Sequence, residues 1–312
     1  MSDATVFAVR TALALYPGRY RRERGDELAV VFADTTAGAG PVAKARELLD
    51  LGAYGLRMRT GLTSTSTGGR LAALAAPLVV GAAGGLAAGQ ALLSYLESGV
   101  PHGGWGLLYF LPYWALLGAA MLSAVAALLG RWTVAKVLAG VSALAAVVEL
   151  VRVATRPEII QPLWTFLEAF QWDGPFVLWA LVLLAAPREG LPVPSWRERG
   201  LLLAAAVLTP VAAFADNVYT SWHHLDPRWR ALMVVVPLLM ALTAVRGWDL
   251  VAVPGLAALP WTFSVNLHAL WQQEGGAWKL LPIAVLTVVA SVVLVLLGRR
   301  RGPSGPGGRQ PA

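Results

Sequence analysis

The sequence predicts an all-α protein, a polytopic membrane helical bundle of about eight spans preceded by a small N-terminal cytoplasmic three-helix subdomain. Charged residues make up only 14% of the 312 residues, against about 25% in ordinary soluble proteins. The mean hydropathy is +0.60. The apolar residues also form long runs with few charges, which is the pattern of helices that cross a lipid bilayer.

The first 62 residues differ from the rest because charges are dense and apolar residues recur at helical spacing. We expect helices from Asp3 to Tyr16, from Arg19 to Asp34 and from Pro41 to Leu62, with Pro17 and Gly18 breaking the first from the second. The apolar stripe of the second helix consists of Tyr20, Leu28, Val31 and Phe32, and that of the third of Val42, Ala45, Leu49, Gly52 and Leu56. Three such helices would cover one another's stripes and form a small bundle.

The remaining chain divides into a linker at 63–70, a transmembrane domain at 71–298 and a Pro/Gly-rich tail at 299–312, whose composition predicts disorder. The eight expected spans are Leu71–Leu93, Leu107–Leu129, Val134–Val151, Gly174–Ala186, Leu201–Ala215, Arg230–Val245, Leu250–Asn266 and Leu280–Leu297. The fourth, fifth and sixth are short as apolar runs. An alternative has seven spans and one re-entrant piece, and residues 158–172 would suit an amphipathic helix along the interface.

Basic residues fix the expected orientation, because lysine and arginine concentrate on the cytoplasmic side of membrane proteins. With both termini inside, eight spans place 20 of the 25 basic residues on the cytoplasmic side and 5 outside. Arginine outnumbers lysine 22 to 3, a bias typical of GC-rich bacterial genomes. No signal peptide is evident at the N-terminus. The expected location is therefore the bacterial plasma membrane, with both the N-terminus and the C-terminus cytoplasmic.

The N-terminal segment resembles a family of actinobacterial multi-span membrane proteins that carry a cytoplasmic helical prefix. The resemblance covers about the first fifth of the chain, and its residues are Tyr16, Pro17, Arg19, Tyr20, Arg21, Gly25 and Glu27, followed by Glu47, Leu48, Leu49, Leu51, Gly55, Leu56, Arg57 and Arg59. Some members are permease-like and others are partners of transcriptional regulators, so the resemblance implies a membrane role without naming an activity.

The arginines of the second helix suggest the leading function hypothesis, a non-enzymatic regulatory or scaffold protein whose prefix docks a cytoplasmic partner. The expected docking residues are Arg19, Arg21, Arg22 and Arg24. The simpler alternative is a solvated, salt-bridged face that touches anionic lipid. Nucleic acid is not an expected partner, because Glu23, Asp26 and Glu27 interrupt the basic patch that phosphates require.

The second function hypothesis is a permease-like transporter, or an outward-facing sensor of a small solute or metal. Its expected outer pocket consists of Glu149, Arg152, Asp216, Asn217 and His102. Imidazole and carboxylate groups suit Zn or Cu, and the weak metal candidates are His223, His224, His268 and Asp216. With the spans as given, no charged residue lies at the centre of a span, which argues against ion-coupled transport.

The sequence shows no Walker loop, no GxSxG and no HExxH motif, so neither an enzyme nor a bound cofactor is expected. Two features of the spans predict packing instead. Gly81, Gly85 and Gly89 leave one helix face without side chains, for close contact within the chain or between two copies. Pro254 and Pro260 suit a discontinuous helix of the kind that builds transport sites.

Overall fold

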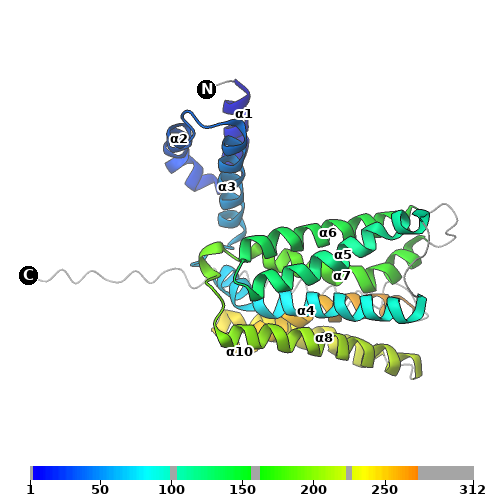
Figure 1. Cartoon of the computed structure of the whole chain (residues 1–312). Helices are drawn as coiled ribbons and strands as arrows, with labels where there is room; N and C mark the ends of the chain where they lie inside the picture. Colours follow the sequence, from blue (N-terminus) through cyan, green and yellow to red (C-terminus); the bar gives the residue numbers. More distant parts are fainter. Residues whose placement is uncertain (1–2, 99–103, 156–161, 223–226, 273–312) are drawn as a thin grey trace, which may run out of the picture. The chain divides into compact units, whose positions relative to one another are not determined.

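The computed structural model describes residues 3–98, 104–155, 162–222 and 227–272, and these residues form α-helices and short 3-10 turns with no strand among them. Clustering of the Cα positions divides the chain into two compact units, described separately below (Figure 1). The first unit consists of residues 1–73 together with Ala185–Gly190, and the second of residues 74–184 and 191–312.

The first unit contains α1 (Asp3–Leu13), α2 (Gly18–Thr35) and α3 (Pro41–Thr60). Tyr16 stands at the centre of its core, beside Leu13 and Phe32. Its hydroxyl donates a hydrogen bond to the Leu51 carbonyl at 3.1 Å, and burial, with smaller contributions from nearby tyrosines, raises the pKa of Tyr16 to about 12. The neutral phenol is therefore the form that holds α1 against α3.

The packed face of α3 includes only one residue of the predicted apolar stripe, Gly52. Val42, Leu49 and Leu56 are 83%, 73% and 50% exposed, and on α2 the predicted core residue Val31 is also exposed. The residues of α3 that pack inward are Leu48, Leu51, Gly52, Gly55 and Met58. Glycine explains the difference, because the Tyr16 ring lies where a Cβ of residue 55 would be, 2.5 Å from the ring carbons.

The second unit holds the bulk of the apolar helices. They are α4 (Thr67–Ser98), α5 (Gly104–Leu128), α6 (Trp132–Ala154), α7 (Pro162–Ala185), α8 (Trp196–Trp222), α9 (Pro227–Leu242) and α10 (Asp249–Gln272). Within the described residues, six of them are long and apolar enough to cross a membrane: α4, α5, α6, α7, α8 and α10.

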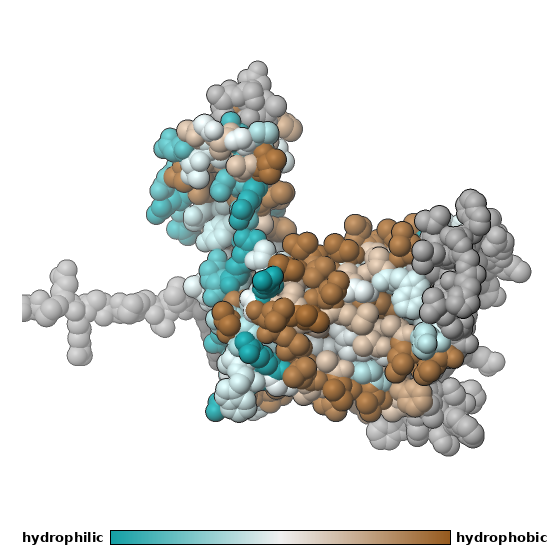
Figure 2. Space-filling model, in the orientation of Figure 1, coloured by the Kyte–Doolittle hydropathy of each residue, from teal (hydrophilic) through white to brown (hydrophobic). Residues whose placement is uncertain are grey.

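Six of the eight expected spans therefore correspond to helices of spanning length. The sixth expected span is a shorter apolar stretch, Leu232–Arg246, and the eighth, Leu280–Leu297, lies outside the described residues. Apolar side chains form large patches on the visible face of the bundle in Figure 2. In the bundle as a whole, Leu144 and Leu208 are 66% and 65% exposed. An exposed apolar surface of this extent is compatible with the hydrocarbon interior of a lipid bilayer.

Two expectations about helix continuity were wrong. Residues 162–172 are the first half of α7 and not a separate interfacial helix. Helix α10 runs unbroken through Pro254 and Pro260, so it is not discontinuous. The Trp179 indole of α7 donates a hydrogen bond to the Ala257 carbonyl of α10 at 2.8 Å. The preceding carbonyl, that of Leu256, loses its helical partner because Pro260 has no amide hydrogen.

The glycine stripe of α4 packs within the chain, against α8. A Cβ at Gly81 or Gly85 would overlap the carbonyl groups of α8, and one at Gly89 would lie 2.8 Å from the Pro210 side chain. On the neighbouring face, a Cβ at Gly84 would come within 2.6 Å of the Ala124 side chain of α5. The backbones of α4 and α8 thus approach as closely as small-residue helix contacts allow.

Candidate functional site

Several polar side chains are buried inside this apolar bundle, where each needs a partner to offset the loss of hydration. Ser123 and Ser142 donate to backbone carbonyls across the α5–α6 contact, at 2.8 and 3.0 Å. The other buried polar residues of the bundle are Gln90, Glu149, Asp173, Ser264 and Asn266. They come from α4, α6, α7 and α10. Glu149 accepts hydrogen bonds from Arg152, and the Asn266 amide donates to the Thr262 carbonyl of its own helix at 2.7 Å.

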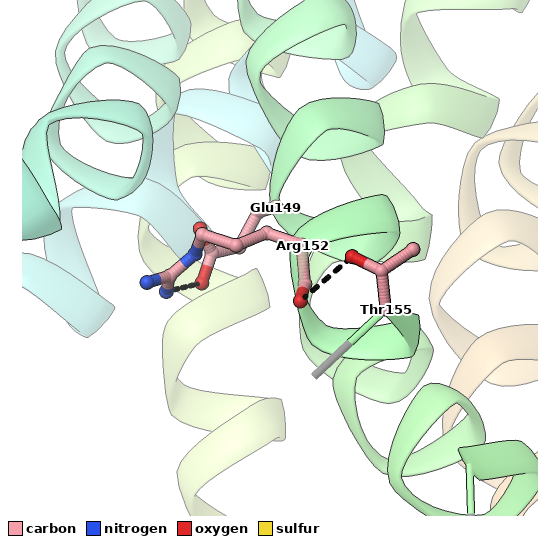
Figure 3. A network of polar contacts seen from close by, with 3 residues as sticks. All are labelled: Glu149, Arg152 and Thr155. Atoms are coloured by element: carbon pink, nitrogen blue, oxygen red, sulfur yellow. Dashed lines mark hydrogen bonds and ion pairs between the residues drawn. The ribbon is translucent and has the colours of Figure 1, made fainter. Parts of the chain in front are cut away.

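Glu149 and Arg152 form an ion pair near the C-terminal end of α6. The guanidinium donates from Nε and Nη2 to the two carboxylate oxygens, and the Nε–Oε2 distance is 2.9 Å (Figure 3). Just beyond, the Thr155 hydroxyl donates to the Val151 carbonyl at 2.8 Å. A cation in the last turn also interacts favourably with the helix dipole. Glu149 and Arg152, three residues apart in the sequence, therefore form a bidentate ion pair in the structure.

Asp173 is the charged group that the sequence analysis missed. Its residue is only 5% exposed, and it lies eight residues beyond the start of the span Thr165–Ala185. It interacts electrostatically with both Glu149 and Arg152. These three groups carry two negative charges and one positive charge when all are ionised. The expectation that no charged residue lies near the centre of a span was wrong.

The sequence around Asp173 loosens the helix at this level. Pro175 lacks an amide hydrogen, so the carbonyl four residues earlier loses its helical partner. Gly174 leaves room for the Phe170 ring, which a Cβ would approach within 2.9 Å. On the other side of Asp173, Trp172 packs against Trp261 of α10 with ring centroids 6.1 Å apart. Aromatic rings therefore pack beside a segment in which proline removes one helical hydrogen bond.

Gln90 of α4 brings a second polar group to the neighbourhood of this segment. It lines a cavity of about 30 Å³ between α4, α7 and α8, whose walls include Trp172, Pro210 and Phe214. Both polar atoms of its amide are buried without a hydrogen-bond partner among the described residues, as are Ser264 Oγ and Asn266 Oδ1 of α10. The cavity exceeds the volume that one water molecule needs, so a water molecule fits beside the amide.

The structure brings together two residues of the expected outer pocket, Glu149 and Arg152. The fifth expected span, Leu201–Ala215, matches the candidate span Trp196–Ala215, and helix α8 continues through Asp216 and Asn217 to Trp222. The side chains of Asp216 and Asn217, like that of His268 in α10, lie outside the described part. His102, His223 and His224 also lie outside it. Among the described residues no group of three or more metal-ligating side chains is present. Zinc or copper at the outer face remains a hypothesis.

Asp173 was missed because the fourth span was expected to begin at Gly174, one residue later. Counting the apolar run "PFVLWALVLLAA" alone places the acid outside the membrane. The helix begins at Pro162, and proline is favoured in the first turn of a helix. That signal was available in the sequence, and it would have placed Asp173 inside the span.

The arginines expected to dock a partner are exposed on α2. Arg19 pairs with Glu23 at 2.9 Å and Arg24 with Glu27 at 3.1 Å, each along its own helix. Arg21 and Arg22 lie between Arg19 and Glu23 in the sequence. Exposed pairs of this kind contribute at most about 1 kcal/mol to stability, so the basic surface is not needed to hold the bundle together.

Comparison with known proteins adds no assignment: no protein-family model, no curated protein and no solved structure matches the chain. The actinobacterial resemblance of the N-terminal segment therefore stays a prediction.

Proposed function

We propose that the chain is a multi-pass protein of the bacterial plasma membrane that binds a small polar or ionic solute inside its helical bundle, as permeases and membrane sensors do. The buried carboxylate of Asp173 carries the proposal, because ionisable groups within spans are costly and are kept mainly where they serve a pathway or a binding site. It lies among apolar helices with one arginine for two acids.

Each group has a distinct part in the proposed site. Asp173 supplies a negative charge and an acceptor for a cationic or hydrogen-bonding solute. Arg152 holds the Glu149 carboxylate in place and limits the negative charge of the cluster. Gln90 offers both a donor and an acceptor from its amide, and the cavity that it lines also touches Trp172, the neighbour of Asp173 in the chain. No enzymatic step is required of these groups.

A thiol-labelling experiment tests whether solutes reach this site. The chain contains no cysteine, so only the introduced thiol can react. Gln90→Cys in intact membranes should react with a small membrane-impermeant cationic thiol reagent. Ala87→Cys, fully buried on the same helix, should not. In the double variant Gln90→Cys/Asp173→Asn, the labelling rate with the cationic reagent should fall about ten-fold relative to the rate with an anionic reagent. The reason is that a buried carboxylate raises the local concentration of cations. Equal labelling at positions 87 and 90, or an unchanged ratio in Asp173→Asn, contradicts the proposal.

A second candidate, the regulatory or scaffold role, draws support from the exposed arginines of α2, which the packing of the N-terminal unit does not need. In this proposal the unit is cytoplasmic, and Arg21 and Arg22, with Arg19 and Arg24, contact an acidic surface of a cytoplasmic protein.

Reversing the two central charges tests this docking role. Arg21→Glu with Arg22→Glu should weaken the association at least about ten-fold, because interface charge reversal adds repulsion to the lost contact. Quantitative mass spectrometry of the proteins that co-purify with the full chain measures the effect. Arg10→Glu, exposed on α1, is the control for charge alone. If both variants retain the same proteins in the same amounts, the arginines of α2 do not dock a partner.

A further inference from the structure

Helix α3 carries an exposed apolar strip formed by Val42, Leu49 and Leu56. The three residues are spaced by seven, which is close to two helical turns, so they lie along one line of the helix. They are 83%, 73% and 50% exposed, and the exposed Ala45 and Ala53 fill the line between them. The core of the N-terminal unit uses the opposite side of α3, through Leu48, Leu51 and Met58.

We propose that this strip is a membrane-binding surface, and that α3 lies on the bilayer with Val42, Leu49 and Leu56 inserted among anionic headgroups. The proposal is independent of the solute site. An amphipathic helix with an apolar face and flanking basic residues partitions into the interface, with the apolar side chains below the headgroups. The strip is one residue wide, which is sufficient for shallow insertion between lipids.

The short connection between α3 and α4 limits how far α3 can lie from the first span. Only residues 61–66 separate the end of α3 at Thr60 from the start of α4 at Thr67, and six residues span at most about 20 Å. Within the same unit, Asp50 of α3 pairs with Arg188 at 3.9 Å, and Arg188 lies three residues beyond Ala185, where the α7 span ends. The strip is thus held at high local concentration beside lipid.

The charges beside the strip suit anionic lipid. On a helical projection at 100° per residue, Arg46 and Arg57 lie about 40° and 60° from Val42. Arg59 lies about 100° away on the other side. The acidic Asp50 lies about 80° from Val42, on the side of Arg57, and it pairs with Arg188. Arginine near a bilayer is attracted to anionic headgroups, and its long stem lets the charge reach them while the apolar neighbours insert. The described surface of α3 therefore offers both the apolar and the basic parts of an interfacial helix.

Electron paramagnetic resonance of a spin label tests the proposal in the full-length protein. Leu49→Cys is labelled in nanodiscs that contain about one-third anionic lipid, and its accessibility to lipid-soluble oxygen is compared with that to a water-soluble nickel complex. We expect oxygen to dominate, because the label sits among acyl chains. Asp26→Cys, exposed on α2, is the matched control and should be accessible mainly to nickel.

A charge variant separates lipid from other occupants. Arg46→Glu with Arg57→Glu leaves the strip intact and should shift the label at position 49 toward water, as should nanodiscs of neutral lipid alone. Three results would overturn the proposal. The first is nickel accessibility at position 49 equal to that at position 26, and the second is protection of position 49 from both reagents, which indicates a protein partner. The third is dipolar broadening of the spectrum, which indicates a second copy of the chain. Labelling at Gln90→Cys does not depend on any of these results.

Discussion

Gly85→Ala should destabilise the folded membrane bundle by about 3 kcal/mol or more, the upper end of the cost of overpacking. The added Cβ would overlap the Ala206 carbonyl group of α8. A carbonyl group belongs to a helix backbone and cannot rotate away as a side-chain end can, so the two helices must separate. Separation loosens every contact along the stripe, because Gly81 and Gly89 face the same helix.

Gly118→Ala supplies the matched control for this prediction. Gly118 lies in α5, and a Cβ built there meets no atom within 4 Å. Alanine is the better helix former by about 0.5–1 kcal/mol, so this variant should be neutral or slightly more stable. Thermal loss of the monodisperse species in detergent, measured by size-exclusion chromatography, compares the two. Equal midpoints for Gly85→Ala and Gly118→Ala would show that α4 and α8 are not in close contact.

Arg152→Gln should cost about 3 kcal/mol of stability, because it leaves the Glu149 carboxylate without its cation beside Asp173. Removing one member of a buried pair costs about 3–5 kcal/mol, and the lower figure applies here since the Arg152 side chain is 25% exposed. The bundle would then hold two acids whose mutual repulsion is no longer offset. Unfolding in detergent, followed by the same thermal assay, measures the loss.

Two further variants show whether the stability loss in Arg152→Gln comes from the lost charge or from the changed side-chain shape. Glu149→Gln together with Arg152→Gln removes a whole pair, and it should be more stable than Arg152→Gln alone. Asp173→Asn in the Arg152→Gln background should also recover part of the loss, since one of the two carboxylates is gone. If Asp173→Asn restores none of the stability lost in Arg152→Gln, Asp173 does not interact electrostatically with Glu149, and the three residues do not form one cluster.

Much of the fold follows from local patterns. A run of apolar residues long enough to cross a bilayer predicts a helix wherever it occurs, because only helices satisfy their own backbone groups in hydrocarbon. For this reason six of the expected spans correspond to described helices. The Glu149–Arg152 contact was predictable for a similar reason, since residues three apart on a helix share a face.

Positions that depend on a partner helix were not predictable in this way. The sequence by itself determined the helical class, the charged N-terminal segment and the polar pair at the end of α6, because each rests on spacing within one helix. Only the tertiary structure decided that Tyr16 fits against Gly55 and exposes Val42, Leu49 and Leu56, and that Asp173 lies within a span near Glu149 and Arg152. Both depend on which helices approach each other. Small residues such as glycine allow a close approach, but they are not hydrophobic enough for the contact face to be recognised from the sequence pattern.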